Sequence, residues 1–231
     1  MKKILLSVIL LMTFLCAGAQ VLNNTLLGFQ EPTTKIQAIV SDGGRHVYYF
    51  GVFRGELIRN NQTLLSGSGG DDLFLIKTDT SGNLVWARQY GSEGNEAIIR
   101  SDLLKFSNGA LYFSNLIAYT TQLGAFTIEP YGQDRPASCI ARIDTATGNV
   151  VWARRTSLLI NSMSATGNLL MVSGNITSTR GPWLYENQLL QDSTGFSRVG
   201  LMYFDQEGSY LGRKQLYRNV VSTTTGTFGS P

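Results

Sequence analysis

Three aspartates recur at comparable points of the sequence and carry the side chain that a cation site needs. Asp79, Asp144 and Asp205 lie 65 and 61 residues apart, and each opens a segment that ends in glycine and a polar residue. A turn such as Asp-x-Ser-Gly-Asn could supply half of a calcium loop, because calcium binds clustered oxygens. Each turn offers a single aspartate, however, and an aspartate that opens a turn accepts hydrogen bonds from nearby backbone N–H groups. We interpret the three residues as turn caps and predict no metal site.

The supply of histidine and cysteine limits nucleophilic catalysis. His46 is the single histidine, so a Ser-His-Asp or Cys-His system would have to use it. It enters an expected strand beside Arg45 with no motif around it, which favours an ordinary exposed or half-buried histidine. Cys139 lies within another expected strand, where a buried and unreactive thiol is the usual outcome. These counts also exclude a histidine-rich or cysteine-rich metal centre.

Four further carboxylates are the remaining candidates for acid-base chemistry. Asp71, Asp72, Glu93 and Glu96 could in principle provide the two acids that a glycosidase places across a cleft. The sequence does not give their separation, and carboxylates at loop ends are usually solvated. We therefore predict no catalytic residue.

Aromatic side chains provide the candidates for ligand contact. Trp86 and Trp152 hold the same place in two sequence repeats, so we predict packing between sheets rather than stacking on sugars. Trp183, Tyr185 and Tyr131 fall outside the repeat register, in long connections. We name these three as candidate ligand contacts, because aromatic residues are enriched at binding surfaces. Packing within the connections is the commoner role of such residues.

The repeat aspartates, Trp86 and Trp152 belong to a pattern of strand, tight turn and strand that occurs three times. The copies occupy residues 71–88, 138–154 and 198–213. A second strand pair precedes each copy, with turn signals at Gly43-Gly44, Asn108-Gly109 and Thr166-Gly167. The unit is therefore four short strands, and the three units cover about residues 36–91, 97–155 and 159–217.

A four-stranded unit repeated at this interval is typical of a β-propeller, in which each blade is one small twisted meander. Strands rich in Val, Ile, Leu, Tyr and Phe, often apolar on both faces, fit sheets that stack face to face. No stretch after residue 19 has helical periodicity. We predict an all-β fold with about three four-stranded blades, in an incomplete or open propeller, because propellers typically need four or more blades to close.

Each unit carries a longer connection between its second and third strands, at residues 54–70, 119–137 and 179–197. Residues 57–64, with Asn60-Asn61 at the tip, and residues 184–189 resemble small hairpins, because asparagine tolerates positive φ. Binding is expected in such connections, since long loops in a tight repeat are frequently functional.

The first 19 residues have the pattern of a secretory signal peptide. Lys2 and Lys3 precede an apolar run, and Ala17-Gly18-Ala19 supplies the small residues that signal peptidase requires. The run is too short for a permanent anchor, and Leu15 before Cys16 argues against a lipoprotein. Residues 20–35 are then a lead-in strand, and residues 218–231 are the start of a further repeat or a tail. We predict a secreted or cell-envelope location, with no membrane span after signal cleavage.

Charge and cysteine content narrow the class of partner. The formal net charge of +3 falls to +1 when Lys2 and Lys3 are removed, which gives no electrostatic case for nucleic acid or an anionic membrane. Only Cys139 remains beyond residue 19, so no internal disulfide can form. Stability must then come from apolar burial.

The first unit resembles the β-propeller repeats of secreted bacterial proteins, the SBBP repeats common in Bacteroidetes. The matching residues are Gly70 to Lys77, Asp79, Ser81-Gly82-Asn83, Leu84-Val85-Trp86-Ala87 and Tyr90-Gly91, preceded by an inner strand at 47–55. The resemblance extends over nearly all of residues 36–217 and is weakest in the third unit, where Gly212 stands near the tryptophan position. It implies a propeller fold and an envelope or extracellular setting, and it implies no activity, because such repeats are scaffolds for many roles.

Residues 144–152 also resemble the tryptophan-docking motif of PQQ-like propeller repeats, found in quinoprotein dehydrogenases and in the outer-membrane assembly propeller. In that motif a Thr-Gly pair makes the turn and the tryptophan docks between blades. A vicinal cysteine pair and a metal-binding set, which the quinoproteins are expected to show, are not visible in this sequence. The resemblance therefore implies shared blade mechanics and no cofactor.

Taken with the lack of catalytic groups, these patterns predict an exported, non-catalytic β-propeller module that scaffolds an interaction with a protein or a glycan. Two alternatives remain open. The first alternative is the N-terminal fragment of a propeller enzyme, glycan-active or quinone-dependent, whose catalytic residues lie beyond Pro231. The second alternative is an envelope assembly component.

Overall fold

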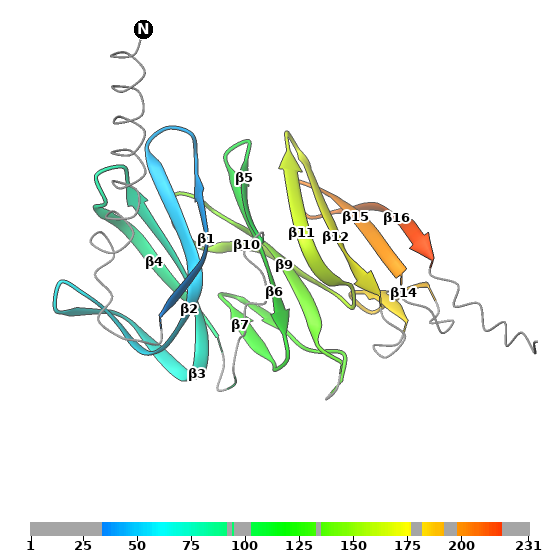
Figure 1. The fold of residues 1–231 in the computed structure, drawn as a ribbon, viewed down its shortest axis with the longest axis horizontal. Helices are drawn as coiled ribbons and strands as arrows, with labels where there is room; N and C mark the ends of the chain where they lie inside the picture. The colour runs from blue at the N-terminus through cyan, green and yellow to red at the C-terminus, as the bar shows by residue number, and fades with distance from the viewer. Residues whose placement is uncertain are drawn as a thin grey trace, which may run out of the picture.

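The computed structural model describes residues 34–91, 94, 103–132, 135–176, 182–191 and 198–218. All regular elements in these ranges are β-strands, and they form four antiparallel sheets, none of which closes on itself (Figure 1). The predicted all-β class is therefore confirmed. The expected signal peptide, most of the lead-in and tail, and the acids Glu93 and Glu96 lie outside the described residues. Within these ranges no helix has the length and apolar character needed to cross a membrane.

Two of the three larger sheets contain four strands, as predicted for each unit, whereas the other contains six, because a hairpin from residues 183–191 adds to its edge. Sheet one has the order β1 (Lys35–Ser41), β2 (His46–Arg59), β3 (Gln62–Asp79), β4 (Leu84–Tyr90). Sheet two has β5 (Leu104–Ser107), β6 (Ala110–Ile117), β9 (Ala137–Ile143), β10 (Val150–Thr156), and then β13 (Trp183–Tyr185) and β14 (Gln188–Gln191). Sheet three has β11 (Leu159–Thr166), β12 (Leu169–Ile176), β15 (Arg198–Asp205), β16 (Tyr210–Arg218). The fourth sheet is the small hairpin β7 (Thr121–Leu123) and β8 (Phe126–Ile128).

The three larger sheets stack with their faces together, side by side in Figure 1, because their central strands are apolar on both sides. The first layer of the core joins sheets one and two, where the rings of Phe50 and Phe113 lie 5.0 Å apart. The second layer joins sheets two and three through side chains such as Ile140, Val172 and Met202, all fully buried. The apolar faces of neighbouring sheets thus bury each other.

Both repeat tryptophans lie between sheets, as predicted. Trp86 is 7% exposed, and its indole Nε1 donates to the Thr145 carbonyl of sheet two at 3.1 Å. Trp152 is 3% exposed and donates in the same way to the Gln206 carbonyl of sheet three at 3.0 Å. The acceptors occupy the turn that follows the repeat aspartate of the next sheet. The same interaction therefore joins both pairs of neighbouring sheets.

A basic side chain accompanies each indole. Lys77 Nζ donates to the Thr145 carbonyl at 2.7 Å, and Arg142 donates to the Gln206 carbonyl at 3.0 Å. Lys77 and Arg142 both stand two residues before the repeat aspartate of their own sheet. Each turn thus receives one indole and one cation from the preceding sheet.

The three turn aspartates cap their turns, which supports the structural interpretation of the sequence. Asp79 Oδ1 accepts hydrogen bonds from the N–H groups of Ser81 and Asn83, at 2.9 and 2.8 Å. Asp144 and Asp205 accept equivalent bonds within their own turns. The bond from the Asn83 side chain is the largest cause that holds the pKa of Asp79 below its ordinary value. The Asp144 and Asp205 carboxylates therefore fix the two turns that receive the indoles.

The long connections form hairpins. Asn60 and Asn61 have φ of 52° and 60° at the tip of the extended β2–β3 hairpin, and Glu186 has φ of 50° at the tip of β13–β14. Both small hairpins predicted from the sequence are therefore present, whereas β7–β8 was not predicted. The connections leave the sheets at the end opposite the aspartate turns (Figure 1).

The contact between indole and turn leads to a prediction about Gly148. This glycine has φ of +75°, and a Cβ added to it would lie 2.9 Å from the Trp86 ring. Gly148→Ala should lower the free energy of unfolding by about 2–5 kcal/mol, because backbone strain and overpacking both act. Gly109 has the same φ with nothing within 4 Å of an added Cβ, so Gly109→Ala measures backbone strain alone. Urea denaturation of both variants tests this, and equal losses would contradict the docking role of the glycine.

Candidate functional site

The single histidine braces a turn. His46 Nδ1 lies 2.7 Å from Asp42 Oδ2, while Asp42 Oδ1 accepts from the N–H groups of Gly44, Arg45 and His46. Partial burial raises the pKa of Asp42, and these hydrogen bonds together outweigh it and hold the pKa well below its ordinary value. The neighbouring Ser41 hydroxyl donates to the backbone carbonyl of His46 and not to the ring. The histidine and carboxylate therefore act on backbone geometry.

Cys139 is fully buried in the layer between sheets one and two. Burial raises the pKa of its thiol to about 12, so the thiolate is not populated at neutral pH. This placement supports the sequence interpretation of Cys139 as a packing residue.

The two adjacent aspartates have different environments. Asp71 is paired with Arg54 at 2.9 Å on the surface. Asp72 is fully buried, and its two oxygens accept from the N–H and the hydroxyl of Ser68 at 2.7 and 3.2 Å. Burial is the largest influence on Asp72 and raises its pKa above the ordinary aspartate value. Asp72 therefore fixes the base of the β2–β3 hairpin. In the described part of the chain, no three residues of the types His, Cys, Asp and Glu group together as a metal site would need.

Two of the three candidate ligand contacts are buried. Trp183 is 1% exposed and covers Gly200 of sheet three, where an added Cβ would lie 2.7 Å from the indole. Tyr185 is 8% exposed and stacks on Tyr210 with ring centroids 5.0 Å apart. The β13–β14 hairpin reaches this position because Tyr185 pairs with Thr156 at the edge of sheet two. Neither ring offers a free face, so both have a packing role in the structure.

Tyr131, the third candidate, is half-buried and joins three segments. The Arg155 guanidinium lies over its ring, 4.7 Å from the centroid, and its hydroxyl donates to the Glu186 carbonyl at 2.8 Å. Arg155 also donates to the Glu129 carbonyl and the Asn187 side chain, at 2.8 and 2.6 Å. Burial is the main cause that raises the pKa of Tyr131, and Arg155 opposes it. The pair ties the second connection to β10 and to the β13–β14 turn.

A hollow of about 460 Å³ lies beside this cluster. Its lining residues are Ala118, Tyr119, Thr120, Glu129, Pro130 and Gly132. Tyr119 is 56% exposed, although the underside of its ring lies on Gly94, where an added Cβ would be 2.5 Å away. Tyr119 is not among the ligand contacts predicted from the sequence. The signal was present, because Tyr119 is the first residue of the connection that also contains Tyr131.

The backbone that carries Tyr119 is fixed by neighbouring strands. The Thr121 hydroxyl donates to the Tyr119 carbonyl at 2.9 Å, and the Gln122 N–H donates to the Gly91 carbonyl after β4 at 3.3 Å. Tyr119 is therefore an exposed aromatic platform just before β7, a strand that is bonded to the end of sheet one, and Thr120 and Glu129 line the same hollow. This arrangement can bind a ligand and contains no nucleophile paired with a base.

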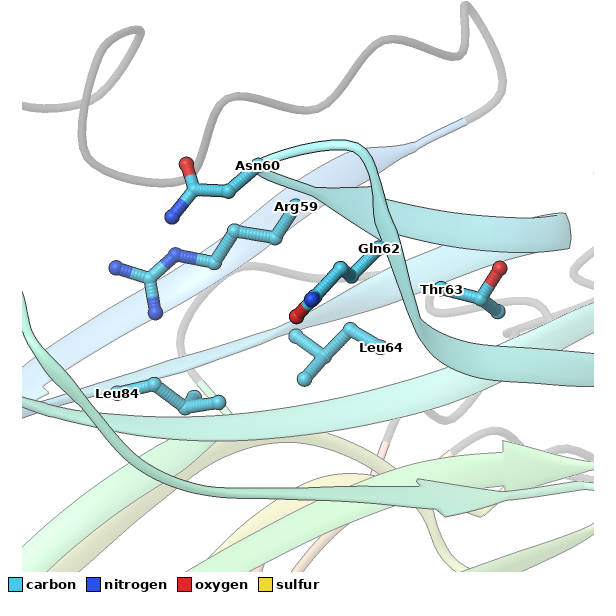
Figure 2. A pocket seen from close by; sticks show the side chains of 6 residues that line it. All are labelled: Arg59, Asn60, Gln62, Thr63, Leu64 and Leu84. Atoms are coloured by element: carbon cyan, nitrogen blue, oxygen red, sulfur yellow. The ribbon is translucent and has the colours of Figure 1, made fainter.

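A second, smaller hollow of about 240 Å³ lies under the tip of the β2–β3 hairpin (Figure 2). Arg59 and Leu64 of the hairpin face Leu84, the first residue of β4.

No protein-family model matches the chain, and the search of curated proteins found no match.

The buried carboxylate predicts a pH dependence. The raised pKa means that folded Asp72 holds its proton more tightly than the unfolded chain does, so its contribution favours folding at low pH. That contribution is lost as the pH rises from about 4 through the raised pKa. Asp72→Asn cannot ionise, so its stability relative to the unsubstituted chain should be greater at pH 7.5 than at pH 4.5. Urea unfolding at both values measures this, with Asp71→Asn as the control. A stability difference independent of pH would contradict it.

Proposed function

We propose that this chain is an exported, non-catalytic β-propeller module that scaffolds an interaction with a protein or a glycan. The propeller assignment is supported by three antiparallel sheets, two of four strands and one of six, stacked through a repeated indole-to-turn contact, since each blade of a propeller is one small antiparallel meander. The resemblance of residues 36–217 to secreted propeller repeats supports the same assignment. Export rests on the basic and apolar pattern of residues 1–19.

We propose a non-catalytic role because the residues that could react make structural contacts instead. His46 and Asp42 brace a turn, Cys139 is buried with a raised pKa, and Asp72 holds the base of a hairpin. Each group is bound to a structural partner or shielded from solvent. Among the residues that line the Tyr119 hollow, Glu129 is the single carboxylate, whereas a glycosidase places two acids across a cleft.

Tyr119 is the single observation that carries the binding proposal. Its ring is exposed beside a hollow, and its backbone is bonded to Thr121 of β7, whose neighbour Gln122 is bonded to the end of sheet one. An aromatic face gives apolar contact with a sugar ring or with an apolar side chain of a protein. The Thr120 hydroxyl and the Glu129 carboxylate add hydrogen-bonding groups at the rim, which suits either ligand class.

A binding experiment on the purified mature chain tests this function. Tyr119→Ala should weaken binding to a glycan array, or cross-linking of an envelope protein through a photoreactive residue at position 120, by about tenfold or more. Leu211→Ala is the matched control, because Leu211 is 58% exposed and lies on sheet three. Binding that survives Tyr119→Ala, or that Leu211→Ala weakens equally, would contradict the assignment of the Tyr119 hollow.

A further inference from the structure

The β2–β3 hairpin differs from the other two long connections in the sheet that it contacts. In the second connection, Gln122 of β7 bridges to Gly91 after β4 of sheet one. In the third, Tyr185 of β13 pairs with Thr156 of β10 in sheet two. Both hairpins therefore reach back to the preceding sheet.

The first hairpin folds back over its own sheet. It leaves sheet one beyond the pair Arg54 and Asp71, where the register shifts and Gly55 has φ of +75°. The Arg59 guanidinium near its tip then donates to the Gly82 carbonyl at 2.6 Å. Gly82 lies in the β3–β4 turn, at the opposite end of the sheet from Asp71, so the hairpin spans the whole face. Figure 2 shows Arg59 and Leu64 of the hairpin turned toward Leu84, the first residue of β4.

The folded hairpin covers an apolar face. Phe53, Phe74 and Ile76 on the side of sheet one away from sheet two are fully buried. Leu57 of the hairpin is buried in the same cluster, and Leu64 and Leu65 pack against it. At the two interior interfaces, the corresponding burial is supplied by a neighbouring sheet.

The polar contact at the turn has an interior counterpart as well. Gly148 of sheet two occupies the same turn position as Gly82, and its carbonyl accepts from the Tyr90 hydroxyl of the preceding sheet at 2.9 Å. In sheet one, the carbonyl of the equivalent glycine accepts from Arg59. Both the apolar and the polar parts of a sheet-to-sheet contact are thus reproduced by the hairpin.

We propose that the β2–β3 hairpin is an internal substitute for a preceding sheet. The hairpin covers the outer face of sheet one, and the apolar and polar contacts of that face fit another antiparallel β-sheet. While the hairpin is in place, no such sheet can dock there, and this includes a sheet from a second copy of this chain. We infer that the partner is a β-sheet because the equivalent faces and turns of sheets two and three are each covered by a neighbouring sheet. The proposal does not depend on the ligand of the Tyr119 hollow.

A shortened hairpin tests whether the covered face docks a sheet. Residues 57–65 are replaced by Asn-Gly between Glu56 and Ser66, which face each other in the ladder, so the Ser68 contact with Asp72 is retained. The exposed faces should then pair symmetrically. Sedimentation velocity is expected to show concentration-dependent dimers, with a several-fold increase in binding of a hydrophobic dye. A folded variant that remains monomeric, with unchanged dye binding, would overturn the proposal.

A point substitution tests the closure in a chain with an intact hairpin. Arg59→Ala removes the bond to the Gly82 carbonyl, so amide hydrogen exchange in residues 56–66 should become at least about fivefold faster. Exchange in sheets two and three should not change. Arg54→Ala is the control, because Arg54 makes an exposed ion pair at the hairpin base. Unchanged exchange in residues 56–66, or an equal increase with Arg54→Ala, would show that Arg59 does not close the face.

Discussion

The structure depends on backbone carbonyls in tight turns that must find donors when a neighbouring sheet covers them. A carbonyl that is removed from water without a donor destabilises the fold, so every covered turn needs a polar partner from the next layer. Trp86 and Lys77 donate hydrogen bonds to a carbonyl in the turn after Asp144. Trp152 and Arg142 donate in the same way to a carbonyl in the turn after Asp205. The ring of each indole also needs a glycine beneath it, which Gly148 and Gly208 provide. Turn chemistry and sheet packing are therefore one constraint.

The same constraint explains why the first unit differs from the other two. The turn after Asp79 has no indole from a preceding sheet in the described residues, and Arg59 of the hairpin bonds its Gly82 carbonyl instead. A cation on a long side chain can do this because guanidinium N–H groups bond carbonyls strongly while the stem packs on apolar surface. At the other end of the stack, Tyr203 and Gly212 stand at the positions that Lys77 and Trp86 hold in sheet one. Sheet three therefore lacks this pair of donors for a further turn.

Local features were predictable from the sequence, whereas contacts between distant segments were not. The capping by Asp79, the hairpin tip at Asn60-Asn61 and the buried position of Trp86 follow from turn chemistry and repeat register. The burial of Trp183 and Tyr185 depends on pairing with Thr156, about 30 residues earlier, and no periodicity encodes that pairing. The exposure of Tyr119 was also missed, because sequence does not show which aromatic residue of a connection turns outward. The candidate binding residue therefore changed from the predicted set to its neighbour.

The distribution of contacts indicates where ligand binding is compatible with this architecture. The aspartate turns are occupied by indoles, cations or Arg59, so a ligand there would compete with the contacts that hold the sheets together. At the opposite end, the second and third connections form hairpins that contact the preceding sheet, and Tyr119 stays exposed. A substitution of an exposed residue at that end, such as Tyr119, changes surface chemistry without opening the stack. The contacts that stabilise the stack and the exposed surface around Tyr119 are thereby separated along the strand direction, so surface residues of such a repeat scaffold can vary while the turns stay the same.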